Sequence, residues 1–204
     1  MDENLRTFLQ HHSNMKYSLF LNKLKQSIYT PIAQLNAFVH KSTEPLCFED
    51  MKNERFDNIK IGDSWGGFFD CAWFKFTADI ENMQKNLVAV IDVGGEGCIY
   101  NKDGEVIQGI TNVLGMVDNF QTVKGKAVIP LDRIDTFKDG KVLFYADCGN
   151  NGRGGKSSGQ ARFKRADICV FRQDILDLYY DILACYQLLS AVNDNAQKRE
   201  IKAH

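Results

Sequence analysis

Seven short segments, each rich in β-branched and aromatic residues, follow one another through the middle of this sequence. Clusters of Gly, Asp and Asn, which are typical of turns, separate them. No stretch with helical periodicity stands between them, so the pattern disfavours a parallel α/β sheet and predicts an antiparallel sandwich. The predicted strands are residues 72–78, 87–92, 98–102, 105–108, 127–131, 142–146 and 161–171.

Asp103 and Gly104 lie between the third and fourth of these strands. A two-residue type I′ turn needs positive φ at both central positions, and Asp-Gly is a favoured pair there. We therefore predict a tight hairpin with a type I′ turn at this point.

Helical periodicity occurs towards the two ends of the chain. Apolar residues recur at three- and four-residue steps in residues 15–34, where Pro31 marks the expected end of a helix, and a second helix is predicted over residues 174–193. Residues 44–67 are predicted to be loop with one or two edge strands. The expected organisation is an N-terminal helical arm (1–34), a β-sandwich (35–171) and a C-terminal helix (172–204).

Composition restricts the class of protein, its partners and its cellular compartment. Of 204 residues, 44% are hydrophobic and 25% are charged, and the net charge of -1 gives no reason to expect nucleic acid or an anionic membrane as a partner. The six cysteines include no C-x-x-C pair, which indicates free thiols in a reducing compartment. The first ten residues lack the pattern of a secretory signal, and Asp177 and Asp181 interrupt the longest apolar run. A cytoplasmic protein without a transmembrane segment is predicted.

A glycine-rich segment over residues 149–157 superficially suggests a phosphate-binding loop. A Walker A motif ending at Ser157 would need Gly at position 150, where Asn150 stands, and a following helix where a strand is predicted. A loop between strands is therefore favoured over nucleotide binding. Basic residues in and after this segment could still contact an acidic partner or a missing domain. These residues are Arg153, Lys156, Arg162, Lys164 and Arg165.

The sequence offers little for metal or nucleophile chemistry. The four histidines are His11, His12, His40 and His204, and none has converging Cys or His neighbours at the spacing of a zinc site. We predict no metal site and no catalytic residue in this chain. A pairing of His40 with a cysteine would require tertiary proximity that sequence does not reveal.

Aromatic residues around the first predicted strand could form a platform on which sugar rings stack. Trp73 alternates with core-type residues and is interpreted as structural packing. Trp65, Phe68 and Phe69 are the candidate carbohydrate-binding residues, with Trp65 expected to be exposed because it adjoins glycines in a loop.

Three carboxylates, Asp70, Asp92 and Glu96, flank the same glycine-rich part of the predicted sandwich. Two carboxyl groups roughly 5–9 Å apart can hydrolyse a glycosidic bond. The alternative is that Asp92 and Glu96 accept hydrogen bonds from turn amides around the neighbouring glycines.

Four blocks of sequence, in order and spacing, resemble the N-terminal domain of glycoside hydrolase family 38 α-mannosidases of the cytosolic and bacterial kind. These blocks are residues 63–65 (DSW), 73–75 (WFK), 92–100 (DVGGEGCIY) and 104–109 (GEVIQG). Residues 151–152 (NG), 164–167 (KRAD) and 178–181 (LYYD) resemble the family's N-G turn, its K-R-A-[ED] strand and the helix that leads into its catalytic domain. The resemblance covers about residues 60–192.

This resemblance implies a galactose-binding-like jelly roll that precedes a zinc-dependent catalytic domain. The family's His-x-Asp zinc motif is missing, because Ser13, Asn14 and Ser42 stand two residues after His11, His12 and His40. The expected function is a non-catalytic domain that supports the active site or assembly of a parent α-mannosidase, and the zinc is expected in the absent catalytic domain. The alternative is an autonomous carbohydrate-binding module whose ligands are mannosides.

The C-terminal helix carries more apolar surface than one contact needs, since 14 of the 18 residues from 175 to 192 are apolar. Ile175, Leu178, Ile182, Cys185, Leu189 and Val192 are expected to form the stripe that faces the sandwich. Leu176, Tyr180, Leu183 and Leu188 would then form a docking surface. The expected partners are the catalytic domain of the parent chain or a second copy of this chain in a homodimer, and the alternative is cover by the N-terminal helix.

Overall fold

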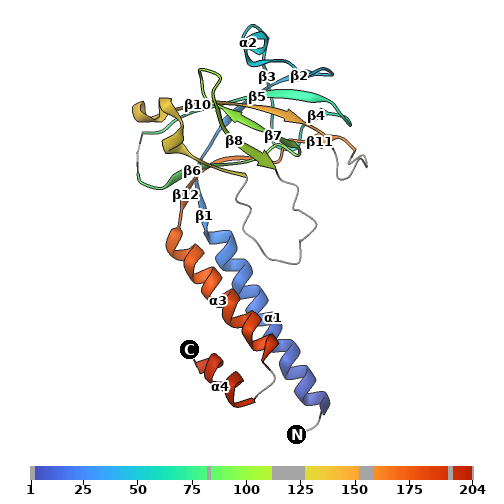
Figure 1. Ribbon diagram of the computed structural model, residues 1–204, viewed down its shortest axis with the longest axis vertical. Coiled ribbons are helices and arrows are strands. Elements are labelled where there is room, and N and C mark those ends of the chain that lie inside the picture. Colours follow the sequence, from blue (N-terminus) through green and yellow to red (C-terminus); the bar gives the residue numbers. More distant parts are fainter. Residues whose placement is uncertain (1–2, 82–83, 112–126, 152–158, 193–194, 204) are drawn as a thin grey trace. The chain divides into compact units, whose positions relative to one another are not determined.

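The computed structural model describes residues 3–81, 84–111, 127–151, 159–192 and 195–203. The chain divides into two compact units (Figure 1). The helical unit comprises residues 1–30 and 171–204, and the sandwich unit comprises residues 31–170.

Among the residues that the structure describes, the sandwich unit is built on a six-stranded and a four-stranded sheet. The six-stranded sheet has the order β3 (Asp57–Asn58), β2 (Asn36–Ser42), β5 (Cys71–Asp79), β10 (Lys141–Gly149), β7 (Glu96–Tyr100) and β8 (Val106–Thr111). The four-stranded sheet has the order β1 (Tyr29–Gln34), β12 (Arg165–Phe171), β6 (Leu87–Asp92) and β9 (Val128–Pro130). The ladders of β5 with β10 and of β6 with β12 are antiparallel, as the sequence pattern predicted.

Shorter elements connect these strands. A two-stranded sheet joins β4 (Ser64–Gly66) to β11 (Ala161–Arg162). Short helices in the described part of the chain include α2 (Phe48–Met51), the 3₁₀ helix η2 (Leu131–Arg133) and the 3₁₀ helix η3 (Asp135–Asp139).

Alternating residues of the strands form the core between the sheets. Phe74 and Phe76 of β5 point inward, and the Phe76 ring stacks on Phe144 of β10 with ring centroids 5.0 Å apart. Ala89 of β6 and Ile168 of β12 are fully buried in the same cluster. The two-residue period of the sequence therefore corresponds to the inner face of each sheet.

The opposite face of β5 carries a second apolar cluster, which we call the outer aromatic cluster: Phe48, Trp73, Tyr100 and Tyr145. The Phe48 ring lies 5.8 Å from Trp73, 5.9 Å from Tyr100 and 5.6 Å from Tyr145. Trp73 is 2% exposed, and its indole N–H donates to the carbonyl of Leu46. The predicted structural role of Trp73 is confirmed.

The β7–β8 hairpin forms as predicted, but its turn is of another type. Asn101 donates its backbone N–H to the carbonyl of Glu105, which leaves a three-residue loop over residues 102–104. Only Gly104 in this loop has positive φ (87°), whereas a type I′ turn would also need positive φ at Asp103. The type I′ prediction was therefore wrong, because the extra residue moves the closing bond to Asn101.

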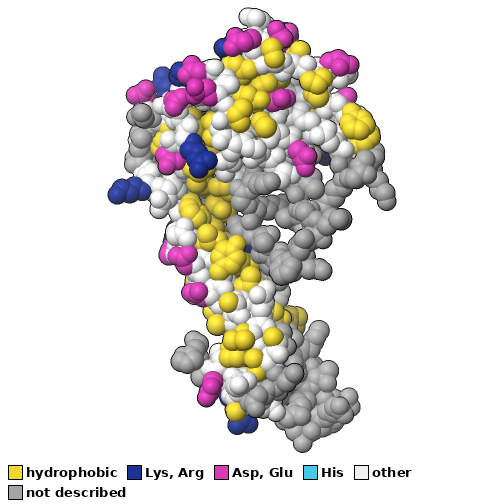
Figure 2. Space-filling model, in the orientation of Figure 1, with side chains coloured by type: hydrophobic (Ala, Val, Ile, Leu, Met, Phe, Trp, Pro, Cys, Tyr) yellow, Lys and Arg dark blue, Asp and Glu magenta, His cyan; other side chains and the backbone are white. Residues whose placement is uncertain are grey.

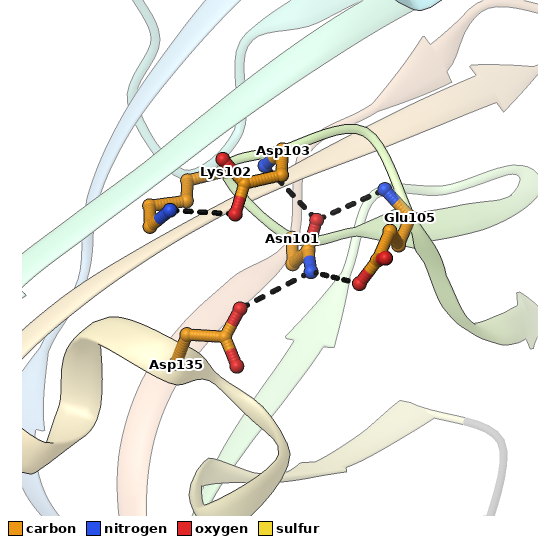
Figure 3. Close-up of polar contacts among 5 residues, drawn as sticks. All are labelled: Asn101, Lys102, Asp103, Glu105 and Asp135. Carbon is orange, nitrogen blue, oxygen red and sulfur yellow. Dashed lines mark hydrogen bonds and ion pairs between the residues drawn. The ribbon is translucent and has the colours of Figure 1, made fainter.

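The Asn101 side chain organises this turn (Figure 3). Its Oδ1 accepts from the backbone N–H groups of Asp103 (3.0 Å) and Glu105 (2.9 Å). Its Nδ2 donates to the carboxylates of Glu105 (2.9 Å) and Asp135 (3.2 Å), and the latter belongs to η3. A single buried amide thus joins the hairpin to a distant segment of the chain.

The last predicted strand, residues 161–171, is two strands. After β11 the chain leaves the two-stranded sheet: Phe163 donates its N–H to the carbonyl of Asp63, and Lys164 donates to that of Asp92. β12 then pairs with β6 in the four-stranded sheet. The break occurs because the chain changes sheets, which the continuous apolar pattern does not reveal.

The helical unit contains α1 (Glu3–Ser27), α3 (Gln173–Ala191) and α4 (Asn195–Ala203). α1 and α3 pack side by side (Figure 1). The rings of Tyr17 and Tyr186, one from each helix, are 5.7 Å apart. Contrary to the expected helix end at Pro31, α1 ends at Ser27, and Pro31 lies in the edge strand β1. An edge strand tolerates proline because an edge residue need not donate an N–H to a neighbour.

All six cysteines are free thiols, as predicted. Within the described ranges, no helix combines the length and the apolarity needed to cross a bilayer.

Candidate functional site

One loop at an end of the six-stranded sheet contains two of the three predicted carbohydrate-binding residues, Phe68 and Phe69. Residues 67–70, here called the Phe69 loop, connect β4 to β5 and lie beside Asn150, the residue that follows β10. Asn150 donates its backbone N–H to the Asp70 carbonyl (3.0 Å) and accepts from the Phe69 N–H (2.9 Å). Its buried Nδ2 donates to the carbonyls of Gly67 (2.8 Å) and Gly159 (3.0 Å).

The carboxylate of Asp70 fixes the same loop from within. Its Oδ2 accepts a hydrogen bond from the N–H of Gly67 (2.7 Å), and its backbone N–H donates to the carbonyl of Gly67 (3.2 Å). These bonds close a tight turn around Phe68 and Phe69. The loop backbone is therefore held by its own polar groups and by Asn150.

Trp65 does not belong to an exposed platform. Its side chain is 2% exposed, its indole N–H donates to the carbonyl of Val93, and its ring meets Phe74 edge-on at 5.6 Å. The expectation that Trp65 is exposed was wrong, because β4 turns its side chain into the core. A buried ring of this kind offers no face for a sugar to stack on.

Phe68 and Phe69 lie at the surface end of the loop. Phe69 is 63% exposed and adopts positive φ (67°), whereas Phe68 is half-buried. Their ring centroids are 4.0 Å apart. The two rings thus form a small aromatic ledge, of which Phe69 is the accessible member.

The three predicted carboxylates serve separate local roles. Oδ1 of Asp92 accepts from the N–H of Gly94 (2.9 Å), which matches the expected bond to a turn amide. Glu96 instead accepts from the hydroxyl of Thr111 (3.2 Å), and Asp70 closes the Phe69 loop. Each carboxylate therefore has a structural partner.

The basic and histidine candidates are dispersed. Arg153 and Lys156 lie outside the described residues, while Arg162 donates to the carbonyl of Gly62 (2.9 Å). Arg165 forms an ion pair with Asp167 (2.6 Å), and Nδ1 of His40 lies 3.1 Å from the carbonyl oxygen of Arg55. Among the residues that the structure describes, no three His, Cys, Asp or Glu side chains are grouped so as to hold a metal ion.

Thiol chemistry is disfavoured at two positions in the sandwich unit. Burial raises the pKa of Cys71, and the negative charges of Asp147, Asp70 and Glu44 raise it further. Burial also raises the pKa of Cys169 to about 11. Both groups are therefore protonated near neutral pH, and a thiol is a poor nucleophile compared with a thiolate.

Asp147, on the outer face of β10, is a polar feature that sequence reasoning missed. It pairs across the sheet with Trp73 on one side and Cys98 on the other. Burial raises the pKa of its carboxyl group. The alternation of β10 could have placed it on the outer face, but not beside Trp73.

Asn150 was also missed as a functional candidate. In sequence it appears only as the residue that breaks a Walker A pattern, and its contacts to Gly67 and Gly159 depend on the fold. A lone Asn after a predicted strand carries no stronger signal.

The four predicted docking residues lie on α3 with different exposures. Tyr180 is 44% exposed and Leu188 is 49% exposed, while Leu176 and Leu183 are half-buried. The helix buries Tyr179, which belonged to neither predicted set, whereas Leu178 and Cys185 of the expected covered stripe are exposed. That choice of stripe was wrong because α1 packs against α3 along a different face, which includes Tyr186.

Comparison with known protein families matches residues 30–169 to a family described as "Alpha-mannosidase, jelly roll domain". A search of curated proteins finds no significant match. The matched region runs from β1 to β12 and so coincides with the sandwich that carries the Phe69 loop. Because the match covers more than half of the 204 residues, this chain belongs to the α-mannosidase jelly roll domain family.

Proposed function

We propose that this chain is the non-catalytic N-terminal domain of a zinc-dependent α-mannosidase of glycoside hydrolase family 38. The observation that carries the proposal is the family match over residues 30–169, because these residues form the sandwich itself. In this role the domain supports the active site and the assembly of a parent enzyme in the cytoplasm. The zinc belongs to the catalytic domain of that enzyme.

The described side chains do not fit a zinc site, since no three potential ligands are grouped among them. No hydrolytic step is therefore assigned to these residues. Their contribution is to fold a rigid sandwich and to present surfaces to the rest of the enzyme.

Of the four predicted docking residues on α3, docking of the catalytic domain is assigned in this proposal to the two exposed ones, Tyr180 and Leu188. Leu176 and Leu183 are half-buried, and helical spacing puts them on the same face as Tyr186, which contacts α1. Tyr180 and Leu188 are large, substantially exposed side chains on a helix whose Tyr179 is already buried. Figure 2 shows hydrophobic side chains exposed along the helices of the helical unit. Large apolar side chains that are exposed together on a helix are typical of a protein–protein interface.

The first test measures hydrolysis of an aryl α-mannoside by the purified chain, with and without added zinc. We expect no turnover in either condition. Zinc-dependent turnover that co-purifies with the chain through several columns would contradict the proposal.

The second test uses the full-length gene product. We expect it to hydrolyse the mannoside with zinc, and we expect Tyr180→Asp/Leu188→Asp to lower its melting temperature and activity. Gln187→Asp, which adds charge at an exposed polar position of α3, serves as the control. If the double variant kept the wild-type melting temperature and activity, the docking role would be contradicted. Light scattering would then show whether a second copy of the chain uses this surface instead.

A further inference from the structure

Phe69 combines a strained backbone with an exposed side chain. Its φ of 67° lies in the left-handed region, where a bulky side chain is disfavoured and glycine is usual. With 63% of the residue exposed, little packing is available to offset that strain. Strain of this kind persists where surrounding structure enforces it, and it is concentrated at functional sites.

The surrounding structure does enforce it. The Phe69 N–H donates to the carbonyl of Asn150, and Asn150 is itself held by Gly67 and Gly159 through its buried amide. Asp70 closes the turn on the other side through Gly67. The Phe69 ring is therefore presented from a fixed backbone and is supported by the half-buried Phe68, whose ring centroid is 4.0 Å away.

We infer that Phe69 is a stacking residue for the pyranose ring of a mannoside. A rigid, exposed aromatic face suits the C–H face of a sugar ring, and fixing it in advance reduces the entropy lost on binding. The choice of mannoside rests on the proposed function, whereas the presence of a binding site rests on the strain, exposure and anchoring of Phe69. Trp65 takes no part, because it is buried.

The test is a titration of the purified chain with methyl α-mannoside and an α-mannobioside, followed by NMR. We expect saturable shifts at millimolar affinity and a loss of at least tenfold in affinity for Phe69→Gly. Phe69→Trp should retain binding. Val106→Ala removes an apolar side chain that is also exposed (61%) but lies on strand β8, and this variant should bind like the wild type.

The denaturation midpoint separates a binding role from a structural one. Glycine relieves the strain at positive φ, so Phe69→Gly should unfold at the same midpoint as the wild type or a higher one. A lower midpoint would mean that Phe69 stabilises the fold, and that result would overturn the inference. The inference would also be overturned if the wild type showed no saturable shifts, or if Phe69→Gly bound the sugar with equal affinity. Neither outcome bears on the accessory role, which is tested separately with the full-length gene product.

Discussion

Two turns, one beyond each end of the ladder between β7 and β10, are built in the same way. They differ in the residue that adopts positive φ. Each is organised by a buried asparagine, Asn101 in the β7–β8 hairpin and Asn150 beside the Phe69 loop. Each contains a residue with positive φ, which is Gly104 in the hairpin and Phe69 in the loop. The hairpin thus has glycine, the residue best suited to positive φ, whereas the loop has a bulky phenylalanine at the corresponding position.

The difference follows from what surrounds each position. A Cβ added at Gly104 would lie 2.5 Å from the Phe48 ring, so the hairpin approaches the outer aromatic cluster too closely for a side chain. Phe69 is exposed and meets no such limit. Gly104 is therefore required by packing, whereas no packing contact of this kind accounts for the residue type at Phe69.

The largest expected effect is that of Gly104→Val. Positive φ at a β-branched residue and the clash with Phe48 together should lower the free energy of unfolding by about 2–4 kcal/mol. Gly62→Val is the matched control, because Gly62 has φ of 98° but no atom within 4 Å of an added Cβ. It should cost only about 1–2 kcal/mol. Chemical denaturation measures both, and equal losses would show that Phe48 does not restrict the hairpin.

The second prediction compares the two asparagines. Asn150→Ala leaves the carbonyls of Gly67 and Gly159 without this donor, and Asn101→Ala leaves the N–H groups of Asp103 and Glu105 without this acceptor. Each change should cost about 1–3 kcal/mol. Of the two, only Asn150→Ala should weaken the mannoside titration, because only Asn150 holds the Phe69 loop.

Asn151→Ala, at an exposed neighbour of Asn150, is the control and should change stability by no more than about 0.5 kcal/mol. If Asn101→Ala weakened sugar binding as much as Asn150→Ala, the two turns would not be functionally distinct.

The smallest expected effect concerns Asp147, which adjoins the outer aromatic cluster. Burial raises the pKa of its carboxyl group in the folded protein, so the ionised form opposes folding above that pKa. This cost to the free energy of folding is present at neutral pH. It disappears as the pH falls below the pKa that the Asp147 carboxyl group has in the unfolded chain. Asp147→Asn should therefore raise stability at neutral pH by about 0.5 kcal/mol or less. Melting curves at neutral and acid pH check the sign, and a gain that persisted in acid would exclude ionisation as its cause.

Much of the sandwich could be predicted from local pattern. The run 87–92 is β6, and the runs 72–78 and 142–146 lie within β5 and β10, because inward residues alternate with outward ones along each strand. The break between β11 and β12 and the end of α1 at Ser27 could not be predicted, since each depends on which sheet the chain joins next.

The candidate site shows the same division. Sequence singled out Phe68 and Phe69 by residue type, and it also singled out Trp65, whose burial against Phe74 arises only when β4 and β5 come together. Asn150 escaped notice because its hydrogen bonds reach Gly67, which is 83 residues away in the chain. Residue type indicates what a side chain can do, but its exposure depends on its neighbours in space.

By itself, the sequence determined the antiparallel sandwich, the flanking helices and the family, because these follow from periodicity and ordered motifs along the chain. Only the tertiary structure decided that Trp65 is core, that α1 packs on the face of α3 that includes Tyr186, and that Phe69 stands exposed at positive φ. The physical reason is that burial and backbone strain are set by contacts between segments distant in sequence, which no local pattern records.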